Sequence, residues 1–273
     1  MQELLIPILA VTAIGLVCGV GLCIASAFMR VQEDERLEKI RACLPGANCG
    51  GCGFSGCDGY ARALLEPGTK TNLCVPGGDA AAQAISAMLG VEAEDVVEQV
   101  AVVQCSGTCE HTQYKQDYRG LPSCKAAKVY FGGTGTCIHG CLGLGDCAKV
   151  CPQGAIGYNK GVAQVDLHKC IGCGLCSRTC PQGIIQIVPD VIRTAVLCSS
   201  KDKGARTKAA CSAGCIGCKK CERTCEADAI HVTDNVARID YTRCTGCGKC
   251  AEVCTSGVIR YGDFSGIHHI HAE

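Results

Sequence analysis

The stretch CIGCGLCSRTCP, residues 170–181, places four cysteines at the spacing C-x2-C-x2-C-x3-C and closes on a proline. Cysteines two residues apart can point both of their thiolates at one metal centre. The glycines between them allow the backbone to wrap closely around a bound centre and to aim N–H groups at its sulfurs. The stretch therefore predicts a metal centre around which this part of the chain folds.

The same run occurs again 74 positions later, with Thr255 in place of the proline. That offset also superimposes cysteines outside the runs, pairing Cys124 with Cys198, Cys137 with Cys211, Cys141 with Cys215, Cys147 with Cys221 and Cys151 with Cys225. Between the cysteines, AIGYNKGVAQVD (155–166) aligns with AIHVTDNVARID (229–240), and each pattern predicts a short β-hairpin. We infer that one module has been duplicated.

Both runs have the spacing of bacterial two-cluster ferredoxins, in which the fourth cysteine of each run ligates the cluster of the other run. This crossover predicts two [4Fe–4S] clusters in each module. In the first module the predicted ligand sets are Cys137, Cys141, Cys147 and Cys180, and Cys151, Cys170, Cys173 and Cys176. In the second module they are Cys215, Cys218, Cys221 and Cys254, and Cys225, Cys244, Cys247 and Cys250.

The first module departs from the pattern, because Leu144 stands where the second module has Cys218. Its spacing becomes C-x3-C-x5-C-x3-C, and we expect Cys137 to be the substitute ligand. A three-iron centre is the alternative at this position. Zinc is the other metal that any four cysteines could hold, but closely spaced thiolates with a crossover partner favour iron–sulfur clusters.

A different spacing, C-x2-C-x4-C-x16-C, precedes the duplicated modules and predicts a further set, Cys49, Cys52, Cys57 and Cys74. The surrounding stretch LPGANCGGCGFSGCDGYARAL…CVPGG closely resembles the iron–sulfur domain that opens the B subunits of Rnf complexes. GCLGLGDCAKVCPQGAI (140–156) is also similar to that family's first ferredoxin motif, and the resemblance covers essentially the whole chain. It implies a protein that takes electrons from reduced ferredoxin and passes them into a membrane complex that reduces NAD+ and pumps Na+ or H+.

Five further cysteines of the soluble part, besides Cys43, belong to none of these sets. We expect four of the five, Cys105, Cys124, Cys198 and Cys211, to hold a sixth cluster. Cys109 could replace Cys105, and Cys218 could exchange with Cys211. The alternative is that they are free thiols, which a reducing cytoplasm tolerates.

The N-terminus predicts a membrane anchor, because residues 4–28 contain no charged side chain over 25 positions. A helix of that length measures about 37 Å and can cross a hydrocarbon core of about 30 Å. Arg30, Arg36, Lys39 and Arg41 follow it, and this positive flank predicts an N-terminus outside and iron–sulfur domains in the cytoplasm. A cleaved signal peptide ending near Ala25-Ser26-Ala27 is the alternative.

The formal net charge of zero gives no general attraction to nucleic acid. Locally, residues 201–223 hold seven Lys or Arg against Asp202 and Glu222, a stripe suited to docking an acidic ferredoxin or an ordinary solvated loop. No G-x-G-x-x-G or phosphate-loop motif occurs, so we expect NAD and flavin to bind other subunits. No catalytic side chains are expected in this chain.

These observations predict an α+β protein with one N-terminal transmembrane helix, a small iron–sulfur domain and two tandem ferredoxin modules. The expected boundaries are 1–29 for the anchor, 30–45 for a connector, 46–104 for the N-terminal domain, 105–136 for a cysteine-containing linker, 137–190 for module 1, 191–214 for a basic linker, 215–264 for module 2 and 265–273 for the tail. The expected cofactors are five to six [4Fe–4S] clusters. The expected partners are reduced ferredoxin and other Rnf-type subunits. A system that reduces a redox-sensing transcription factor, and a zinc-binding structural protein, are the alternative functions.

Overall fold

The computed structural model describes residues 2–28, 35–130 and 132–262. The predicted tail, 265–273, and residues 30–34 of the predicted connector lie outside these residues. The chain divides into two compact units, Met1–Lys39 and Ile40–Glu273. All of the cysteines predicted as ligands belong to the second unit.

In the first unit, helix α1 (Gln2–Phe28) covers the residues that were expected to form the membrane anchor. Within the described part of the chain, however, no helix combines the length and apolarity needed to cross a membrane. The predicted transmembrane helix is therefore not confirmed, although a helix does form there.

The N-terminal iron–sulfur domain is helical. It contains α2 (Glu35–Cys43), which begins in the first unit, α3 (Cys57–Leu64), the 3₁₀ turn η1 (Val75–Gly77) and α4 (Gly78–Leu89). Helix α4 ends at Gly90, which adopts the left-handed conformation that glycine takes without a Cβ penalty. Tyr60 of α3 is buried, and its hydroxyl donates to the Lys70 carbonyl at 2.7 Å.

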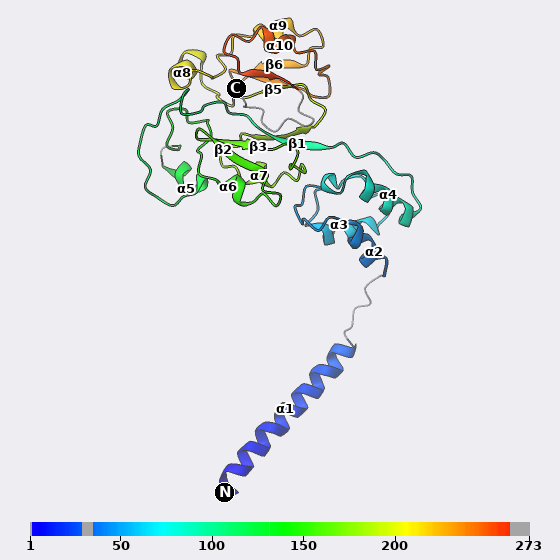
Figure 1. Ribbon diagram of the computed structural model, residues 1–273. Coiled ribbons are helices and arrows are strands. Elements are labelled where there is room, and N and C mark those ends of the chain that lie inside the picture. Colours follow the sequence, from blue (N-terminus) through cyan, green and yellow to red (C-terminus); the bar gives the residue numbers. More distant parts are fainter. Residues whose placement is uncertain (1, 29–34, 131, 263–273) are drawn as a thin grey trace. The chain divides into compact units, whose positions relative to one another are not determined.

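Module 1 consists of two antiparallel strand pairs and three short helices (Figure 1). Strand β1 (Gln99–Val103) pairs with β4 (Ile185–Pro189), and β2 (Ile156–Asn159) pairs with β3 (Val162–Val165). The helices are α5 (Cys124–Val129), α6 (Asp146–Lys149) and α7 (Leu175–Thr179). The pairing of β1 with β4 places residues 99–103 in module 1, although they fall within the predicted bounds of the N-terminal domain, 46–104.

Module 2 repeats this arrangement. Strand β5 (Thr194–Val196) pairs with β8 (Ile259–Tyr261), and β6 (Ile230–Thr233) pairs with β7 (Val236–Ile239), so both predicted hairpins are confirmed. Its helices are α8 (Gly204–Ala210), α9 (Lys220–Thr224) and α10 (Lys249–Glu252). The region expected to be a basic linker, 191–214, therefore contains a strand of module 2 and a helix.

The first strands of the two modules do not follow the 74-residue offset. Val103 of β1 lies opposite Ile185, and Val196 of β5 lies opposite Ile259, which is 74 positions beyond Ile185. Val103 and Val196 are thus equivalent in the fold but 93 positions apart, because 196 − 103 = 93. The segment between the first strand and the first ferredoxin cysteine is longer in module 1.

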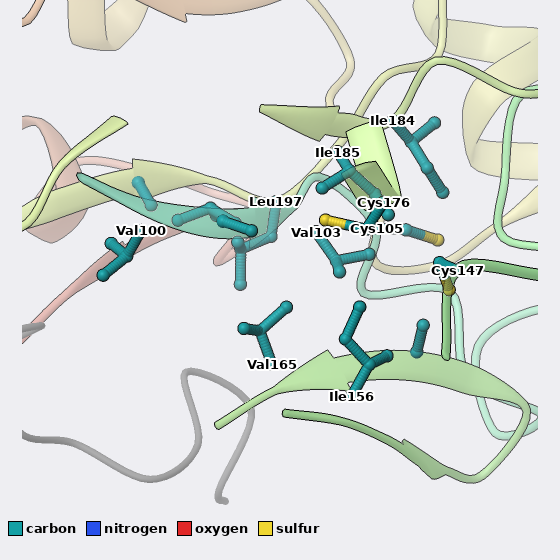
Figure 2. Packing of buried hydrophobic residues seen from close by; sticks show 14 of the residues in the cluster. Val100, Val103, Cys105, Cys147, Ile156, Val165, Cys176, Ile184, Ile185 and Leu197 are labelled. Atoms are coloured by element: carbon teal, nitrogen blue, oxygen red, sulfur yellow. The ribbon is translucent and has the colours of Figure 1, made fainter. Parts of the chain in front are cut away.

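Cysteines are interleaved with the apolar core of each module. In module 1, Val103, Val165 and Ile184 are buried together with Cys105 and Cys147 (Figure 2). In module 2 a second apolar core contains Val196, Ile230, Val236 and Val258, which pack with further cysteines. Aromatic residues make up only 4% of the sequence, so the cores are small. Bound centres would therefore contribute substantially to holding the strands in place.

Candidate iron–sulfur sites

Site 1 is built from Cys49, Cys52, Cys57 and Cys74, the set predicted for the N-terminal domain. Burial raises the pKa of the Cys74 thiol, and electrostatic repulsion from the other three thiols raises it further. The loop is shaped by Asn48, whose left-handed backbone (φ 46°) brings its Oδ1 to within 2.9 Å of the Cys57 N–H. The structure thus brings all four predicted ligands together.

Sites 3 and 5 are equivalent cavities in the two modules. Site 3 is lined by Cys151, Cys170, Cys173 and Cys176, and site 5 by Cys225, Cys244, Cys247 and Cys250. Each set contains one cysteine from the other motif of its module, the arrangement that the crossover rule predicts. The N–H of Ala155 donates to Cys151 Sγ, and the N–H of Ala229 donates to Cys225 Sγ, both at 3.3 Å.

Site 4 gathers Cys215, Cys218, Cys221 and Cys254, again as predicted. Burial raises the pKa of Cys221 to about 11, and the neighbouring Cys215, Cys254 and Cys218 thiols add to the rise. Cys218 is the exposed member of the set, and its sulfur lies 3.9 Å from the hydroxyl of Thr255. Site 4 therefore reaches the protein surface.

Site 2 differs from its predicted set in one residue. Its cavity is lined by Cys124, Cys141, Cys147 and Cys180, and Cys137 is not among the lining residues. Since module 1 has Leu144 where module 2 has Cys218, a cysteine from another segment completes the set. Cys124 supplies the fourth thiol, so the expectation that Cys137 is the substitute does not match the structure.

The position of Cys124 is fixed by one carboxylate. Cys124 begins α5, and Asp146 begins α6 directly before Cys147. Asp146 Oδ2 accepts hydrogen bonds from the Ser123 hydroxyl at 2.8 Å and from the Lys125 N–H at 3.0 Å. These bonds hold the starts of the two short helices together, and Cys124 consequently faces the same cavity as Cys147.

A further cavity, here called the sixth cavity because it would hold a sixth centre, lies between the modules, and its wall contains six cysteines: Cys105, Cys109, Cys137, Cys141, Cys198 and Cys211. Three of the four residues expected for a sixth cluster are present, but Cys124 is absent and Cys137 takes its place. Cys141 already belongs to site 2, and Cys109 is exposed. Of the two exchanges left open, Cys109 does line this cavity and Cys218 does not.

The sequence contained a sign that Cys124 does not belong to this cavity. Cys105 follows β1 and Cys198 follows β5, each two residues after the equivalent valines Val103 and Val196. The 74-residue offset instead paired Cys198 with Cys124, a match that does not correspond to equivalent places in the fold. Comparing the strand endings would have paired Cys105 with Cys198.

The thiols suit a polynuclear centre in their number, chemistry and surroundings. Burial raises the pKa of Cys105 and of Cys176 to about 12, so these thiols are protonated at neutral pH until a metal displaces the proton. Backbone N–H groups aimed at sulfur would stabilise the resulting thiolates. Within the described residues no three His, Cys, Asp or Glu side chains converge on a single metal ion, and the cysteines of sites 2, 3 and 5 line cavities instead.

Three protein families match parts of the chain. Residues 44–76 match a family described as a putative Fe–S cluster domain, residues 163–186 a 4Fe–4S binding domain, and residues 214–258 a 4Fe–4S dicluster domain. These matches include all four thiols of site 1 and the complete thiol sets of sites 4 and 5. An iron–sulfur domain and two ferredoxin domains are therefore present, as the sequence analysis predicted.

The proteins similar to this chain include the B subunits of three complexes. The chain is 39% identical over 244 residues to that of the Na+-translocating ferredoxin:NAD+ oxidoreductase complex of Acetobacterium woodii, covering 89% of this chain and 73% of that protein. It is 41% identical to that of the ion-translocating oxidoreductase complex of Methanosarcina acetivorans, covering 88% and 92%. It is 38% identical to that of the proton-translocating ferredoxin:NAD+ oxidoreductase complex of Clostridium ljungdahlii, covering 78% and 76%.

Proposed function

Because this chain belongs to the family of B subunits of ion-translocating ferredoxin:NAD+ oxidoreductase complexes, we propose that it accepts electrons from reduced ferredoxin and passes them through its thiol sites to other subunits. The chain is an electron-transfer subunit of an Rnf-type complex, with ferredoxin-type iron–sulfur domains. The similar proteins include subunits of an Na+-translocating and of a proton-translocating complex. The family therefore includes subunits of complexes that translocate either ion.

The observation that carries the proposal is the five sets of four thiols at sites 1 to 5. Each set supplies the four cysteines that a [4Fe–4S] cluster requires, and such a cluster carries one electron at a time. The protein residues hold the cluster, keep water away through burial and direct N–H groups at the ligating sulfurs, which sets the reduction potential.

Neighbouring sites share contacts, as a series of electron carriers requires. Between sites 1 and 3, the Arg178 guanidinium donates a hydrogen bond to the Cys49 carbonyl. A methyl group at Gly51 would lie 3.3 Å from the Cys173 carbonyl, which shows how closely the two ligand loops approach. Between sites 3 and 2, the Cys147 thiol is close enough to Cys176 to contribute to the rise in its pKa.

Module 2 offers the surface on which ferredoxin would dock. Cys218 of site 4 and Cys247 of site 5 are exposed, whereas no ligand of sites 1 to 3 is. The basic stripe consists of seven exposed side chains: Lys201, Lys203, Arg206, Lys208, Lys219, Lys220 and Arg223. An acidic electron carrier would be steered toward such a surface and would meet the accessible edges of sites 4 and 5.

We also propose that the chain is held at the cytoplasmic membrane, with its N-terminus outside and its iron–sulfur domains in the cytoplasm. This proposal is supported by the uncharged residues 4–28, by the basic residues after them and by membership in a family of ion-translocating complexes. Protease treatment of right-side-out vesicles should cleave a tag placed at the N-terminus and leave a C-terminal tag intact. The reverse pattern would contradict the orientation.

The function is tested by measuring iron, acid-labile sulfide and zinc in anaerobically purified full-length protein. Five clusters require about 20 iron atoms and as many sulfides per chain. Mixing the protein with reduced ferredoxin should then bleach the visible absorbance of these clusters. Zinc without sulfide would exclude electron transfer, and iron–sulfur clusters that ferredoxin fails to reduce would exclude ferredoxin as the donor.

A further inference from the structure

Of the six cysteines in the wall of this cavity, four are candidate ligands, two from each half of the duplicated region. Cys105 and Cys137 come from the segments that begin module 1, and Cys198 and Cys211 come from those that begin module 2. Cys105, Cys198 and Cys211 are buried, with exposed fractions of 6%, 8% and 7%. Cys137 is close enough to add to the pKa rise that burial causes in each of these three thiols.

The two halves contribute structurally equivalent residues. Cys211 lies 74 positions after Cys137, and Cys198 follows β5 as Cys105 follows β1. The backbone around each pair repeats as well: the Gln104 N–H donates to the Ile184 carbonyl at 2.7 Å, and the Leu197 N–H donates to the Val258 carbonyl at 2.8 Å. Because Ile184 and Val258 are also 74 positions apart, the four thiols form two matched pairs.

Direct hydrogen bonds join this cavity to a ferredoxin site on either side. The N–H of Cys141, a member of site 2, donates to Cys105 Sγ at 3.3 Å. The N–H of Cys215, a member of site 4, donates to Cys198 Sγ at 3.3 Å. Cys141 and Cys215 are themselves equivalent under the 74-residue offset. In each module, therefore, an equivalent hydrogen bond from a backbone N–H to a sulfur links a ferredoxin site to the cavity.

The loops that carry the thiols are tied across the module boundary. The Ser106 N–H donates to the Leu197 carbonyl at 3.1 Å, and the Ser199 hydroxyl donates to the Gln104 carbonyl at 3.0 Å. The Arg238 guanidinium of module 2 donates to Gln104 Oε1 at 2.7 Å. These bonds hold the loop that carries Cys105 against the loop that carries Cys198.

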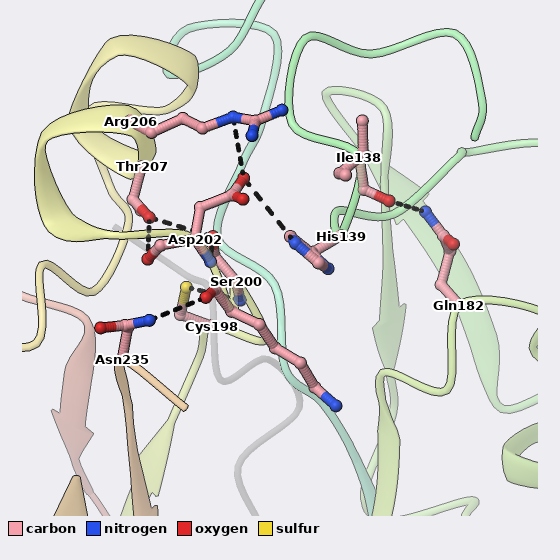
Figure 3. Close-up of polar contacts among 10 residues, drawn as sticks. Ile138, His139, Gln182, Cys198, Ser200, Asp202, Arg206, Thr207 and Asn235 are labelled. Atoms are coloured by element: carbon pink, nitrogen blue, oxygen red, sulfur yellow. Dashed lines mark hydrogen bonds and ion pairs between the residues drawn. The ribbon is translucent and has the colours of Figure 1, made fainter. Parts of the chain in front are cut away.

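Polar contacts hold the remaining parts of the rim (Figure 3). Gln182 Nε2 donates to the Ile138 carbonyl at 2.8 Å and to the Gly140 carbonyl at 3.0 Å, which fixes the loop after Cys137. On the opposite side, the hydroxyls of Ser200 and Thr207 lie 3.0 Å apart. The Ser200 N–H also points at Cys198 Sγ, 3.4 Å away. The rim is thus ordered by bonds that leave the four thiols facing the cavity.

We propose that Cys105, Cys137, Cys198 and Cys211 ligate a sixth [4Fe–4S] cluster, shared by the two modules, through which electrons cross from one module to the other. This inference rests on the proposed function, because it assumes that sites 2 and 4 hold clusters. In the crossing step one electron leaves the reduced cluster of site 4, which returns to its oxidised state, and reduces the shared cluster. The same electron then reduces site 2, with reduced ferredoxin as its source and no proton required.

The existence of the shared cluster is tested first by iron and sulfide counts on the full chain. Six clusters give about 24 iron atoms per chain and five give about 20, so a wild-type count of about 20 overturns the proposal without any variant. Cys198→Ala should lose about four iron atoms. Cys109→Ala, which removes an exposed thiol from the same cavity wall, should lose none. Wild-type iron content in Cys198→Ala, and likewise in Cys105→Ala, would overturn the ligand set.

The crossing itself is tested by stopped-flow reduction with reduced ferredoxin. All clusters of the wild type and of Cys109→Ala should bleach in the fast phase. In Cys198→Ala, which should keep five clusters, only those of sites 4 and 5 in module 2 should bleach in the fast phase. The clusters of sites 1, 2 and 3 should bleach slowly. Fast bleaching of all five would overturn the crossing role.

A wild-type protein that ferredoxin does not reduce would instead contradict the proposed donor. The crossing is then judged from electron paramagnetic resonance of dithionite-reduced protein, which does not depend on ferredoxin. Spin coupling between the modules should be present in the wild type and lost in Cys198→Ala. Equal coupling in the two proteins would overturn the proposal.

Discussion

The hydroxyl of Tyr158 lies 3.7 Å from the sulfur of Cys147, a member of site 2. Burial raises the pKa of the Tyr158 phenol, and the adjacent thiol raises it further, so the phenol keeps its proton and can donate to a ligating sulfur. In module 2 the equivalent position, 74 residues later, is Val232, which has no donor. The hydrogen bond from Tyr158 to a thiol of site 2 therefore has no counterpart at the equivalent position of module 2.

We expect Tyr158→Phe to make the reduction potential of site 2 more negative, because a hydrogen bond to a ligating sulfur stabilises the reduced cluster. Redox titration followed by electron paramagnetic resonance measures the shift, and the iron content should not change. Tyr130→Phe, which alters an exposed tyrosine, is the control. Equal potentials in Tyr158→Phe and the wild type would show that this contact does not tune the site.

Replacing Leu144 by Cys should restore to module 1 the ligand that module 2 has at Cys218. Cys124→Ala alone should lose about four iron atoms, since site 2 is left with three thiols. Leu144→Cys combined with Cys124→Ala should recover them. Measuring the iron content per chain of the two variants shows whether Cys124 is a ligand and whether a cysteine at position 144 can replace it. If Cys124→Ala kept its full iron content, Cys124 would not be a ligand of site 2.

Gly172 tests how tightly strand β1 is held against the loop of site 3. It has a positive φ of 63°, and a methyl group there would lie 2.4 Å from the Gln99 carbonyl. Gly183 has a similar φ of 64° but nothing within 4 Å. Gly183→Ala should therefore cost only the left-handed strain of about 1–2 kcal/mol and keep its iron.

Gly172→Ala has the same strain and must also displace β1, whose Ala101 N–H donates to Cys170 Sγ at 3.4 Å. We expect it to lose about four iron atoms, those of site 3, and to bleach faster in guanidinium chloride. The rate of loss of visible absorbance compares the two variants directly. Equal iron and equal bleaching rates would mean that β1 does not support site 3.

Reversing charge in the basic stripe should slow reduction by ferredoxin. The double variant Lys203→Glu/Lys220→Glu changes two exposed side chains of the stripe, and we expect roughly a tenfold lower second-order rate constant at low ionic strength. The difference should shrink as salt is added, because screening weakens steering. Stopped-flow mixing over a range of salt concentrations provides the measurement.

Arg62→Glu makes the same kind of change on α3, an exposed position in the N-terminal iron–sulfur domain. It should leave the rate constant unchanged if ferredoxin docks on module 2. A slower reaction in Arg62→Glu, with normal rates in the double variant, would move the docking surface to site 1.

The duplicated modules, both hairpins and the family were predictable from the sequence alone, and the ligand sets that we propose for sites 1, 3, 4 and 5 are the ones that the sequence predicted. It could do so because ligands of these sites lie a few residues apart in regular motifs. For example, Cys170, Cys173 and Cys176 are separated by two residues each. In addition, the ferredoxin crossover rule supplies the one distant ligand.

The choice between Cys124 and Cys137 as the fourth thiol of site 2 depends on the tertiary fold. Both lie in a segment without regular spacing, and their neighbours are set by contacts across long sequence separations. Asp146 holds the start of α5 against α6, which turns Cys124 toward site 2. Pairing of β1 with β4 and of β5 with β8 brings Cys105 and Cys198 to one cavity with Cys137. Strand pairing and hydrogen bonds across modules, which local spacing does not encode, therefore decide which cysteines line each cavity.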